Sequence, residues 1–313
     1  MTMERQFDVV ALGEAMLEFN QTTPGQPNYL QGFGGDTSNA VIAAARAGAR
    51  TAYLTRLGTD NFGKALLALW QAEGVNTRAV EADTSAPTGI YFVTHGPAGH
   101  EFSYLRAGSA ASRMDGTWLQ NHAAPVIRAA RILHLSGITL AISQSACDTG
   151  LAAMRLAREA GTLVAFDSNL RLKLWPLERA REAITEAVAA CDIFLPSLED
   201  MQTLTGLTDP DAVVDWSHAH GARKVVLKLG AEGALVSDLD AGGQRQTVPG
   251  VPSQLVDATG AGDCFCGNLL ARVAAGDSLA QAACYANAAA ALSVRGWGAV
   301  APLPRPAAVM HLL

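Results

Sequence analysis

The stretch Asp257-Ala-Thr-Gly-Ala-Gly-Asp263-Cys-Phe, late in a chain of 313 residues, opens a predicted helix that begins near Gly260. Its small residues let the backbone approach a ligand closely, and the start of a helix leaves free N–H groups that point outward. Together these features predict an anion site suited to phosphate. The carboxylate at the end of the loop, Asp263, can accept the proton of a hydroxyl that attacks a phosphoryl group. An Asp that caps a glycine-rich turn is the alternative.

Upstream of this loop, short β-rich apolar runs alternate with Ala- and Leu-rich helical stretches. Continuous apolar strands separated by helices predict an α/β fold with a mostly parallel central sheet that helices cover on both faces. The predicted strands include Val9–Leu12, Ala52–Thr55, Ile132–Leu135, Leu163–Phe166, Ile193–Leu195 and Val225–Leu229. The predicted helices are Thr37–Ala47, Phe62–Glu73, Ser145–Ala160, Leu177–Ala190, Gly260–Ala275 and Leu279–Leu292. Ser278 and Gln281 form a capping box for the last of these helices.

Two segments, 14–33 and 88–106, break this alternation because each reads as two strands joined by a turn. Thr23-Pro24-Gly25 supplies the first turn, and Gly96-Pro97-Ala98-Gly99 supplies the second. Neither segment has an obvious crossover helix. We therefore expect a small β-sheet lid over the edge of the main sheet, and a single domain that spans residues 1–313.

Two further glycine-rich motifs accompany the loop. Gly32-Phe-Gly-Gly35-Asp-Thr-Ser-Asn39 precedes an Ala-rich helix, and Leu57-Gly58-Thr-Asp60-Asn-Phe-Gly63 follows the next strand. Together with the loop at 257–266, this ensemble resembles the two signatures of the ribokinase/PfkB family of carbohydrate kinases. The resemblance implies a ribokinase-like fold, ATP as phosphoryl donor, Mg²⁺, and Asp263 as the general base; a monovalent-cation requirement stays open. It also implies ATP contacts from Gly260, Ala261 and Gly262.

More nucleotide contacts follow from the same resemblance. Lys228-Leu-Gly230-Ala-Glu-Gly233 follows a strand and resembles the family's nucleotide-phosphate turn, with an ordinary β-turn as the alternative. Asn287 matches a position near the adenine, although a solvated or capping role fits this residue too. The remaining implied ATP contacts are Asn169, Arg171 and Ser197.

The metal shell is not defined by the sequence. Many relatives carry Asn-x-x-Glu near the metal and phosphates, whereas this chain has Ser197-Leu-Glu-Asp200. The same four residues also form a capping box for a helix over 199–204. Asp200 and Asp257 are the candidate metal ligands.

Two tyrosines and two arginines indicate the substrate. Tyr104 and Arg106 share one face of the predicted hairpin, Tyr91 lies on the partner strand, and Arg171 follows a core strand whose carboxyl end should meet ligands. Because Arg binds carboxylate through a planar fork, this group favours an anionic sugar, and a surface ion pair is the alternative for Arg106. The runs at 104–110, 134–138 and 169–175 look most like those of 2-keto-3-deoxygluconate kinases. By that resemblance the substrate contacts are Gly34, Gly35, Asn39, Tyr91, Tyr104, Arg106, Arg171 and Asp263.

The expected reaction is therefore phosphorylation of a primary hydroxyl, with 2-keto-3-deoxygluconate converted to its 6-phosphate. Fructokinases and other ketose kinases carry similar arginines and are the alternative. A non-catalytic sugar sensor of this fold would usually have lost the base or the phosphate loop, and both are present here. A nucleoside kinase would favour apolar and aromatic stacking over paired arginines.

Composition excludes several partners. The chain has 23 Lys+Arg against 29 Asp+Glu, a net charge of -6, and no basic run, so neither nucleic acid nor an anionic membrane is expected to bind. The N-terminus does not read as a signal peptide, and no apolar stretch reaches the roughly 18 residues of a membrane span. Five cysteines without metal-site spacing read as reduced core residues of a cytoplasmic protein. Exposed lid edges favour a homodimer or a higher homo-oligomer.

Overall fold

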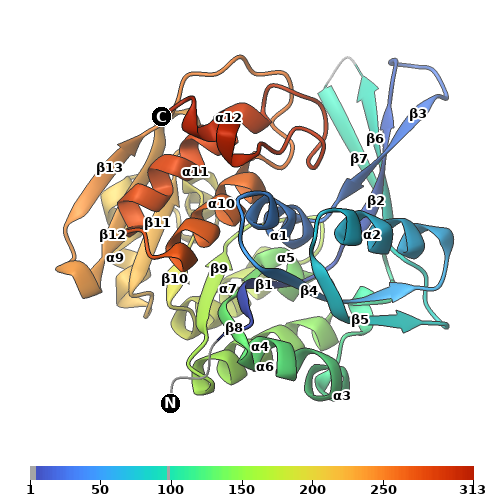
Figure 1. Ribbon diagram of the computed structural model, residues 1–313, viewed down its shortest axis with the longest axis horizontal. Helices are drawn as coiled ribbons and strands as arrows, with labels where there is room; N and C mark the ends of the chain where they lie inside the picture. Colours follow the sequence, from blue (N-terminus) through green and yellow to red (C-terminus); the bar gives the residue numbers. More distant parts are fainter. Residues whose placement is uncertain (1–4, 97–98) are drawn as a thin grey trace.

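A nine-stranded sheet forms the centre of the computed structural model, which describes residues 5–96 and 99–313. Every neighbouring pair from β11 to β5 is parallel, and β12 and β13 extend the other edge antiparallel (Figure 1). The prediction of a mostly parallel sheet is thus confirmed. In spatial order the strands are β13 (Arg245–Pro249), β12 (Gly233–Asp238), β11 (Lys224–Lys228), β10 (Ile193–Phe194), β9 (Leu163–Asp167), β8 (Ala130–Ser136), β1 (Phe7–Leu12), β4 (Thr51–Gly58) and β5 (Asn76–Asp83).

Helices cover both faces of this sheet. On one face lie α1 (Asp36–Arg46), α2 (Asn61–Ala72), α10 (Ala261–Ala275), α11 (Leu279–Ser293) and α12 (Pro306–Met310). On the other lie α3 (Gly116–Trp118), α4 (Ala124–Arg128), α5 (Gly137–Ala141), α6 (Gln144–Glu159), α7 (Leu177–Ala190), α8 (Leu198–Thr205) and α9 (Pro210–Ala219). Short helical turns occupy Ala111–Arg113, Leu119–Ala123, Gly230–Glu232 and Leu239–Ala241. The capping box predicted at Ser278 and Gln281 is present at the start of α11.

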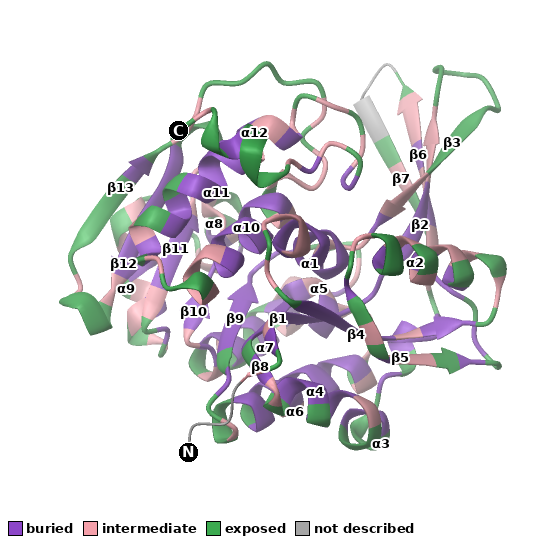
Figure 2. Ribbon diagram, viewed as in Figure 1, coloured by how far each residue is buried: buried purple, intermediate pink, exposed green. Residues whose placement is uncertain are grey.

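The apolar strands owe their continuous pattern to burial on both faces. In β9, Val164 and Phe166 pack into the core beneath α6 and α7, whereas Ala165 points into the core beneath α1 and α10. Successive side chains of a strand point to opposite faces, so a strand covered on both sides needs apolar residues at every position. Figure 2 shows the central strands as a buried layer between the helices.

A second sheet of four strands lies beside the first, in the order β3 (Tyr29–Gly34), β2 (Met16–Gln21), β6 (Ile90–Gly96) and β7 (Gly99–Leu105). Its strands come from the two segments that interrupt the sequence pattern, so the expected small second sheet is confirmed, and we call it the lid sheet after the role expected for it (Figure 1). Residues 97 and 98 of the predicted second turn lie outside the described residues. Across this sheet Glu18 stands in register with Gly32 and with Tyr91, and Tyr91 with Tyr104.

The polar residues of the expected site lie where the parallel strands of the main sheet end. The parallel strands β1, β8, β9 and β11 all end there, and α1 and α10 begin there. Ligand sites of α/β sheets lie outside the carboxyl ends of the strands. Within the described residues, no helix has both the length and the apolar character needed to cross a membrane.

Candidate active site

Asp263 lies in the first turn of α10, at the end of the glycine-rich loop. Gly260 takes the N-cap position with φ 75°, a left-handed conformation that glycine adopts without steric cost. The side-chain amide of Asn39, on α1, donates a 2.8 Å hydrogen bond to Asp263 Oδ2. The structure thus brings together Asn39, the last residue of the first glycine-rich motif, and Asp263 at the end of the loop, 224 residues apart in sequence.

The surroundings of Asp263 keep its carboxylate basic. Burial and, next, the carboxylate of Asp36 raise the pKa of Asp263 to about 7, while the hydrogen bond from Asn39 and the ammonium group of Lys228 act in the opposite direction. A carboxylate with a pKa near neutrality can take a proton from a hydroxyl and release it again under ordinary conditions. This electrostatic setting fits a general base.

Asp36, which the sequence analysis did not single out, is the first residue of α1. Its Oδ2 accepts hydrogen bonds from Ser136 Oγ and, at 2.9 Å, from Asn169 Nδ2. Its Oδ1 is buried and has no hydrogen-bond partner among the described residues. The signal that could have located Asp36 is its place between the paired glycines and Asn39.

Lys228 ends β11 and turns its ammonium group toward the glycine-rich loop. Its Nζ donates a 2.7 Å hydrogen bond to Asp167 Oδ2, and a Cβ built on Gly262 would lie 3.8 Å from this Nζ. Burial works against the charge, but Asp167, together with Cys266 and Asp200, more than compensates and raises the pKa of Lys228. The lysine therefore remains a cation beside the loop at the helix start, which is the arrangement that an anionic phosphate needs.

Asn169 and Ser197 lie at the neighbouring strand ends. Asn169 has φ 27°, a positive value that no other described non-glycine residue has. Ser168 Oγ donates a 2.7 Å hydrogen bond to Asp200 Oδ2, and the Ser197 hydroxyl accepts one of 3.1 Å from the backbone N–H of Asp200. Ser197 is therefore the N-cap of α8, as predicted. The reciprocal half of the predicted capping box is not formed, because Asp200 accepts from Ser168 Oγ and the Ser197 N–H donates to the same hydroxyl at 3.4 Å.

The other predicted nucleotide contacts are Gly230, Gly233 and Asn287, near the ends of β11, β12 and β13. Gly230 and Gly233 have φ 61° and 104°, and a Cβ at Gly233 would meet Val248 O at 2.2 Å. The amide nitrogen of Asn287 donates to Val248 O at 3.1 Å and to Pro249 O at 3.0 Å. Asn287 thus links α11 to the end of β13 and is neither a solvated residue nor a helix cap.

Asp257 shapes the glycine-rich loop from its other end. Its Oδ1 accepts hydrogen bonds from the backbone N–H (2.9 Å) and the hydroxyl (2.7 Å) of Thr259, and its Oδ2 accepts one of 2.9 Å from Gly298 N. In the part of the chain that the structure describes, no cluster of three or more His, Cys, Asp or Glu side chains is arranged to hold a metal ion.

The lid sheet presents Tyr91 to the same edge. Tyr91 is buried, its hydroxyl donates to Glu18 Oε2, and a Cβ on Gly34 would collide with its ring and hydroxyl. Burial raises the pKa of Tyr91, and the carboxylates of Glu18 and Asp263 add to this effect. Gly34 therefore has to be a glycine so that the tyrosine can lie over the start of α1. Glu18 is a second acidic residue that the sequence analysis missed.

Arg106 is held by a buried ion pair. Its Nε donates a 2.7 Å hydrogen bond to Glu14 Oε2, and Glu14 also accepts a hydrogen bond from Ser109 Oγ. The side chains are 9% and 1% exposed for Arg106 and Glu14, so this is no surface pair. The exposed Arg171 donates from Nη1 to Leu170 O at 2.7 Å.

The two predicted substrate arginines share a neighbour in Tyr104. Burial raises the pKa of Tyr104, and the positive charges of Arg106 and then of Arg171 act against that rise. The Tyr104 ring also packs 5.7 Å from the Tyr91 ring, centroid to centroid. Both arginines and both tyrosines therefore occupy one region between the lid sheet and the turn after β9.

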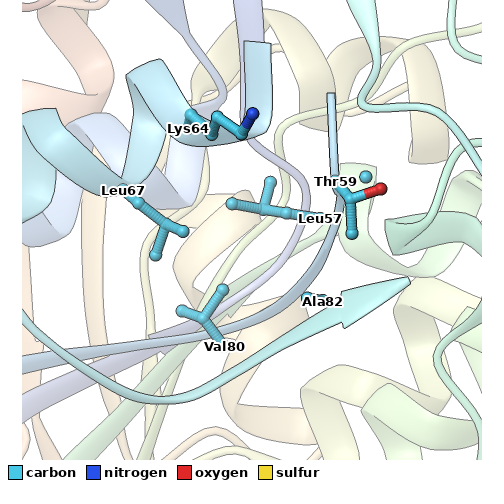
Figure 3. A pocket seen from close by; sticks show the side chains of 7 residues that line it. Leu57, Thr59, Lys64, Leu67, Val80 and Ala82 are labelled. Carbon is cyan, nitrogen blue, oxygen red and sulfur yellow. The ribbon is translucent and has the colours of Figure 1, made fainter. Parts of the chain in front are cut away.

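A separate cavity of about 220 Å³ lies between α2, β4 and β5 (Figure 3). None of the predicted site residues lines it. It is apolar except at Thr59 and Lys64, and its lining residues are Leu57, Gly58, Thr59, Lys64, Leu67, Val80 and Ala82.

Comparison with known proteins identifies the family. The model of the pfkB family of carbohydrate kinases matches residues 6–306. The chain belongs to this family. As a pfkB family member it is 35% identical to the 2-dehydro-3-deoxygluconokinase of Thermoproteus tenax, over 97% of this chain and 94% of that protein. It is 33% identical to Fructokinase-1 of Zea mays, over 97% of each chain.

Solved structures of pfkB kinases share the fold. The PfkB protein from Polaromonas sp. JS666 is 33% identical and superposes with a TM-score of 0.86, covering 96% of this chain and 98% of that one. The fructokinase from Vibrio cholerae O395, solved with fructose, ADP and a calcium ion, is 28% identical with a TM-score of 0.83, covering 97% and 98%. The chain therefore shares its ribokinase-like fold with these two proteins.

Proposed function

We propose that this pfkB kinase transfers a phosphoryl group from ATP to the primary hydroxyl of 2-keto-3-deoxygluconate, giving the 6-phosphate, with Asp263 as the general base. The observation that carries the proposal is the position of Asp263: it stands at a helix start, accepts a hydrogen bond from Asn39, and has a pKa raised to about 7. A base with this pKa is half ionised at neutral pH and can accept the proton of the attacking hydroxyl.

The residues around Asp263 would hold the nucleotide. Gly260, Ala261 and Gly262 form the start of α10, and Lys228 lies beside them as a cation, so the residues present fit a chain of phosphates. The Ala261 N–H already donates to Ala258 O at 3.2 Å, so Ala261 would contact the nucleotide through its place in the loop. ATP supplies the phosphoryl group. Asn169, Arg171 and Ser197, at the ends of neighbouring strands, would orient the phosphates. Gly230, Gly233 and Asn287 lie toward the far edge of the sheet and would border the base.

Mg²⁺ would reach the site together with the nucleotide. Asp257 already accepts two hydrogen bonds from Thr259 in its own loop and one from Gly298 N, whereas Asp200 is engaged at one oxygen by Ser168. Asp200 is therefore the better protein ligand of the two. Because Mg²⁺ commonly binds through one or two carboxylates plus phosphates and water, one such residue is sufficient.

The sugar acid would lie between the lid sheet and α1. Gly34, Gly35 and Asn39 would contact its hydroxyl groups, Tyr91 and Tyr104 would cover it, and Arg106 and Arg171 would supply positive charge for its carboxylate. The similarity to the Thermoproteus tenax kinase supports this substrate. Fructose is the second candidate, because the chain is almost as similar to the maize fructokinase, and a fructose-bound fructokinase shares its fold.

One assay separates these candidates. The purified protein is incubated with ATP, Mg²⁺ and, in turn, 2-keto-3-deoxygluconate, gluconate, fructose, ribose and adenosine, and ADP release is followed. The proposal requires kcat/KM to be highest for 2-keto-3-deoxygluconate. A maximum with fructose would make the protein a fructokinase, and ADP release with none of the sugars would contradict catalysis.

We further propose that residues 1–313 act as one kinase domain, that the small sheet is its lid, and that two copies associate through their lids. Leu30 and Leu105, on the two edge strands of that sheet, are 66% and 64% exposed. Exposed apolar edge strands are surfaces that pair with another chain. All five cysteines are free thiols, four of them buried, which supports a reducing cytoplasm. Light scattering of wild type and Leu30→Asp tests the dimer.

A further inference from the structure

Asp167 is the last residue of β9 and lies among three elements that carry predicted nucleotide contacts. Its Oδ2 accepts hydrogen bonds from Lys228 Nζ (2.7 Å, on β11) and from Cys266 Sγ (3.3 Å, on α10). Its Oδ1 accepts one of 3.2 Å from the backbone N–H of Asn169. A single carboxylate thus connects β9, β11, α10 and the turn that follows β9.

The Asp167–Lys228 pair is buried, with side-chain exposures of 5% and 14%. A buried ion pair stabilises a fold poorly, because the cost of removing both charges from water offsets much of their attraction. Fold stability is therefore a weak reason for placing the pair here. A role in ligand binding explains the pair better, because Lys228 Nζ lies next to the glycine-rich loop: a Cβ built on Gly262 would be 3.8 Å from it.

We propose that Asp167 is a positioning residue that fixes the ammonium group of Lys228 beside the loop from Gly260 to Asp263, aligned for an anionic phosphate before the nucleotide arrives. The inference rests on the proposed kinase function. Cys266 and the N–H of Asn169 orient the carboxylate, so that it presents Oδ2 to the lysine. Lys228 is then prevented from turning away into solvent, and less conformational freedom is lost when a phosphate binds.

The neighbours of Asp167 are suited to this role. Burial raises the pKa of the Cys266 thiol, so Cys266 stays protonated and donates to the carboxylate. Burial lowers the pKa of His134, which is also near Asp167, so its ring stays neutral. Lys228 is therefore the cation that Asp167 holds.

The acid limb of the pH profile gives a readout that a purely structural role would not move. Asp167 raises the pKa of Asp263, whereas Lys228 lowers it. Replacing Asp167 by Asn should shift the acid limb of kcat/KM to lower pH, and replacing Lys228 by Met should shift it to higher pH. The charged and titratable groups that interact with Asp263 are Asp36, Asp167, Lys228, Tyr91, Cys264 and Cys266.

The experiment compares wild type with Asp167→Asn, Lys228→Met and the double variant. ATP affinity is measured by titration without sugar, and kcat/KM is measured against pH with the best sugar of the panel. Asp192→Asn is the matched control, because Asp192 also accepts a hydrogen bond from β9, at Val164 N (2.8 Å), but at the opposite end of the strand. Cys266→Ala is a milder variant for use if Asp167→Asn does not fold.

We expect Asp167→Asn to weaken ATP binding by about tenfold, the equilibrium equivalent of misaligning one charge-assisted hydrogen bond. The KM for the sugar should stay within about threefold of the wild-type value, and the double variant should bind ATP no more weakly than Lys228→Met, because the two residues act as one unit. Cys266→Ala should weaken ATP binding less, in the same direction.

Additive effects of the two substitutions, or normal ATP affinity with an unmoved acid limb, would overturn the role of Asp167. Equal effects from Asp192→Asn would overturn it as well. If no sugar is phosphorylated, the kinase proposal fails while the ATP titrations still report on Asp167.

Discussion

The side-chain amide of Asn39 donates a 2.8 Å hydrogen bond to the carboxylate of Asp263 and so joins the first turn of α1 to the first turn of α10. Two helix starts converge at this contact, and both direct free backbone N–H groups toward the same place. The carboxylate is oriented by a neutral donor, so its charge is fixed in space without being cancelled. That combination suits a group that has to accept a proton.

Asp263→Asn is the direct test of this arrangement. It should lower kcat by ~10²–10⁴, the usual contribution of general-base catalysis, because an amide cannot accept the proton of the hydroxyl. The fold and ATP affinity should be retained, since Asn has the same shape. The check is kcat together with an ATP titration. Asp277→Asn, which alters a partly exposed carboxylate paired with Arg272 just beyond the end of the same helix, is the control. Near-normal kcat in Asp263→Asn would remove the assignment.

The raised pKa of Asp263 predicts how activity depends on pH. The base has to be ionised, so kcat/KM should fall as pH decreases through about 7. Asp36→Asn removes a nearby negative charge that raises this pKa, and the acid limb should then move to lower pH. Profiles of wild type and Asp36→Asn over pH 5–9, recorded with saturating ATP, provide the test. An unshifted limb in Asp36→Asn would contradict the coupling.

The same shift has a consequence for stability. The folded-state pKa lies above the ordinary value of 3.8, so the folded protein holds this proton more tightly than the unfolded chain. The contribution is fully present below about pH 4 and is lost as pH rises through about 7. Asp263→Asn should therefore melt at a higher temperature than wild type at pH 8, and the difference should shrink at pH 5. Thermal unfolding at both pH values measures it, and a lower Tm at pH 8 would contradict the sign.

Gly262→Val tests the loop more cleanly than a change at Gly260. A Cβ at Gly260 would lie 2.8 Å from the Cβ of Ala299 at φ 75°, so substitution there strains the fold itself. A Cβ at Gly262 meets only Lys228 Nζ, at 3.8 Å, so the folded structure should tolerate it. The valine should still weaken ATP binding by roughly tenfold or more, because it blocks close approach to the backbone. Unchanged affinity in a variant with normal Tm would mean that the loop is only a turn.

The sequence predicted the elements whose pattern is set by local burial. Strands covered on both faces, such as Leu163–Asp167, read as apolar runs, and the capping box at Ser278 marks the start of α11. It did not predict β5, whose residues Asn76–Asp83 alternate with charged side chains because this strand forms the outer edge of the sheet. Nor did it predict β12 and β13 as an antiparallel extension, since strand direction depends on partners that no local pattern reveals.

The residues of the candidate site also fall into those that a local sequence pattern revealed and those that it did not. Glycine motifs pointed to the loop at Asp263 because a glycine requirement is local. The acidic residues Asp36, Asp167, Glu14 and Glu18 went unnoticed, because their significance lies in partners distant in sequence. Asp167 meets Lys228 across 61 positions, and Glu14 meets Arg106 across 92. A carboxylate near a turn has no special meaning until its partner is placed beside it.

The last prediction concerns the substrate's carboxylate. If Arg106 contacts it, the loss of this charge-assisted hydrogen bond, worth roughly 1.5–3 kcal/mol, should reduce kcat/KM for 2-keto-3-deoxygluconate by ~10- to 150-fold. Fructose, which has no carboxylate, should be affected much less. Arg106→Ala alone would leave Glu14 charged and unpaired in the interior, at a cost of ~3–5 kcal/mol of stability. The variant of choice is therefore Glu14→Gln with Arg106→Met, which removes both charges together.

The measured quantity is the ratio of kcat/KM for the sugar acid over that for fructose, because a ratio within one preparation cancels any loss of folded protein. The ratio should exceed one in wild type and fall toward one in the double variant. Arg171→Ala should instead lower kcat/KM by a similar factor for both substrates, because this exposed residue is also expected to contact phosphate. Arg155→Ala, at a surface ion pair with Glu186, is the control and should leave the ratio unchanged. A wild-type ratio at or below one would contradict carboxylate recognition and favour the fructokinase alternative. A high ratio that survives the double variant would keep the substrate and move the anion site away from Arg106.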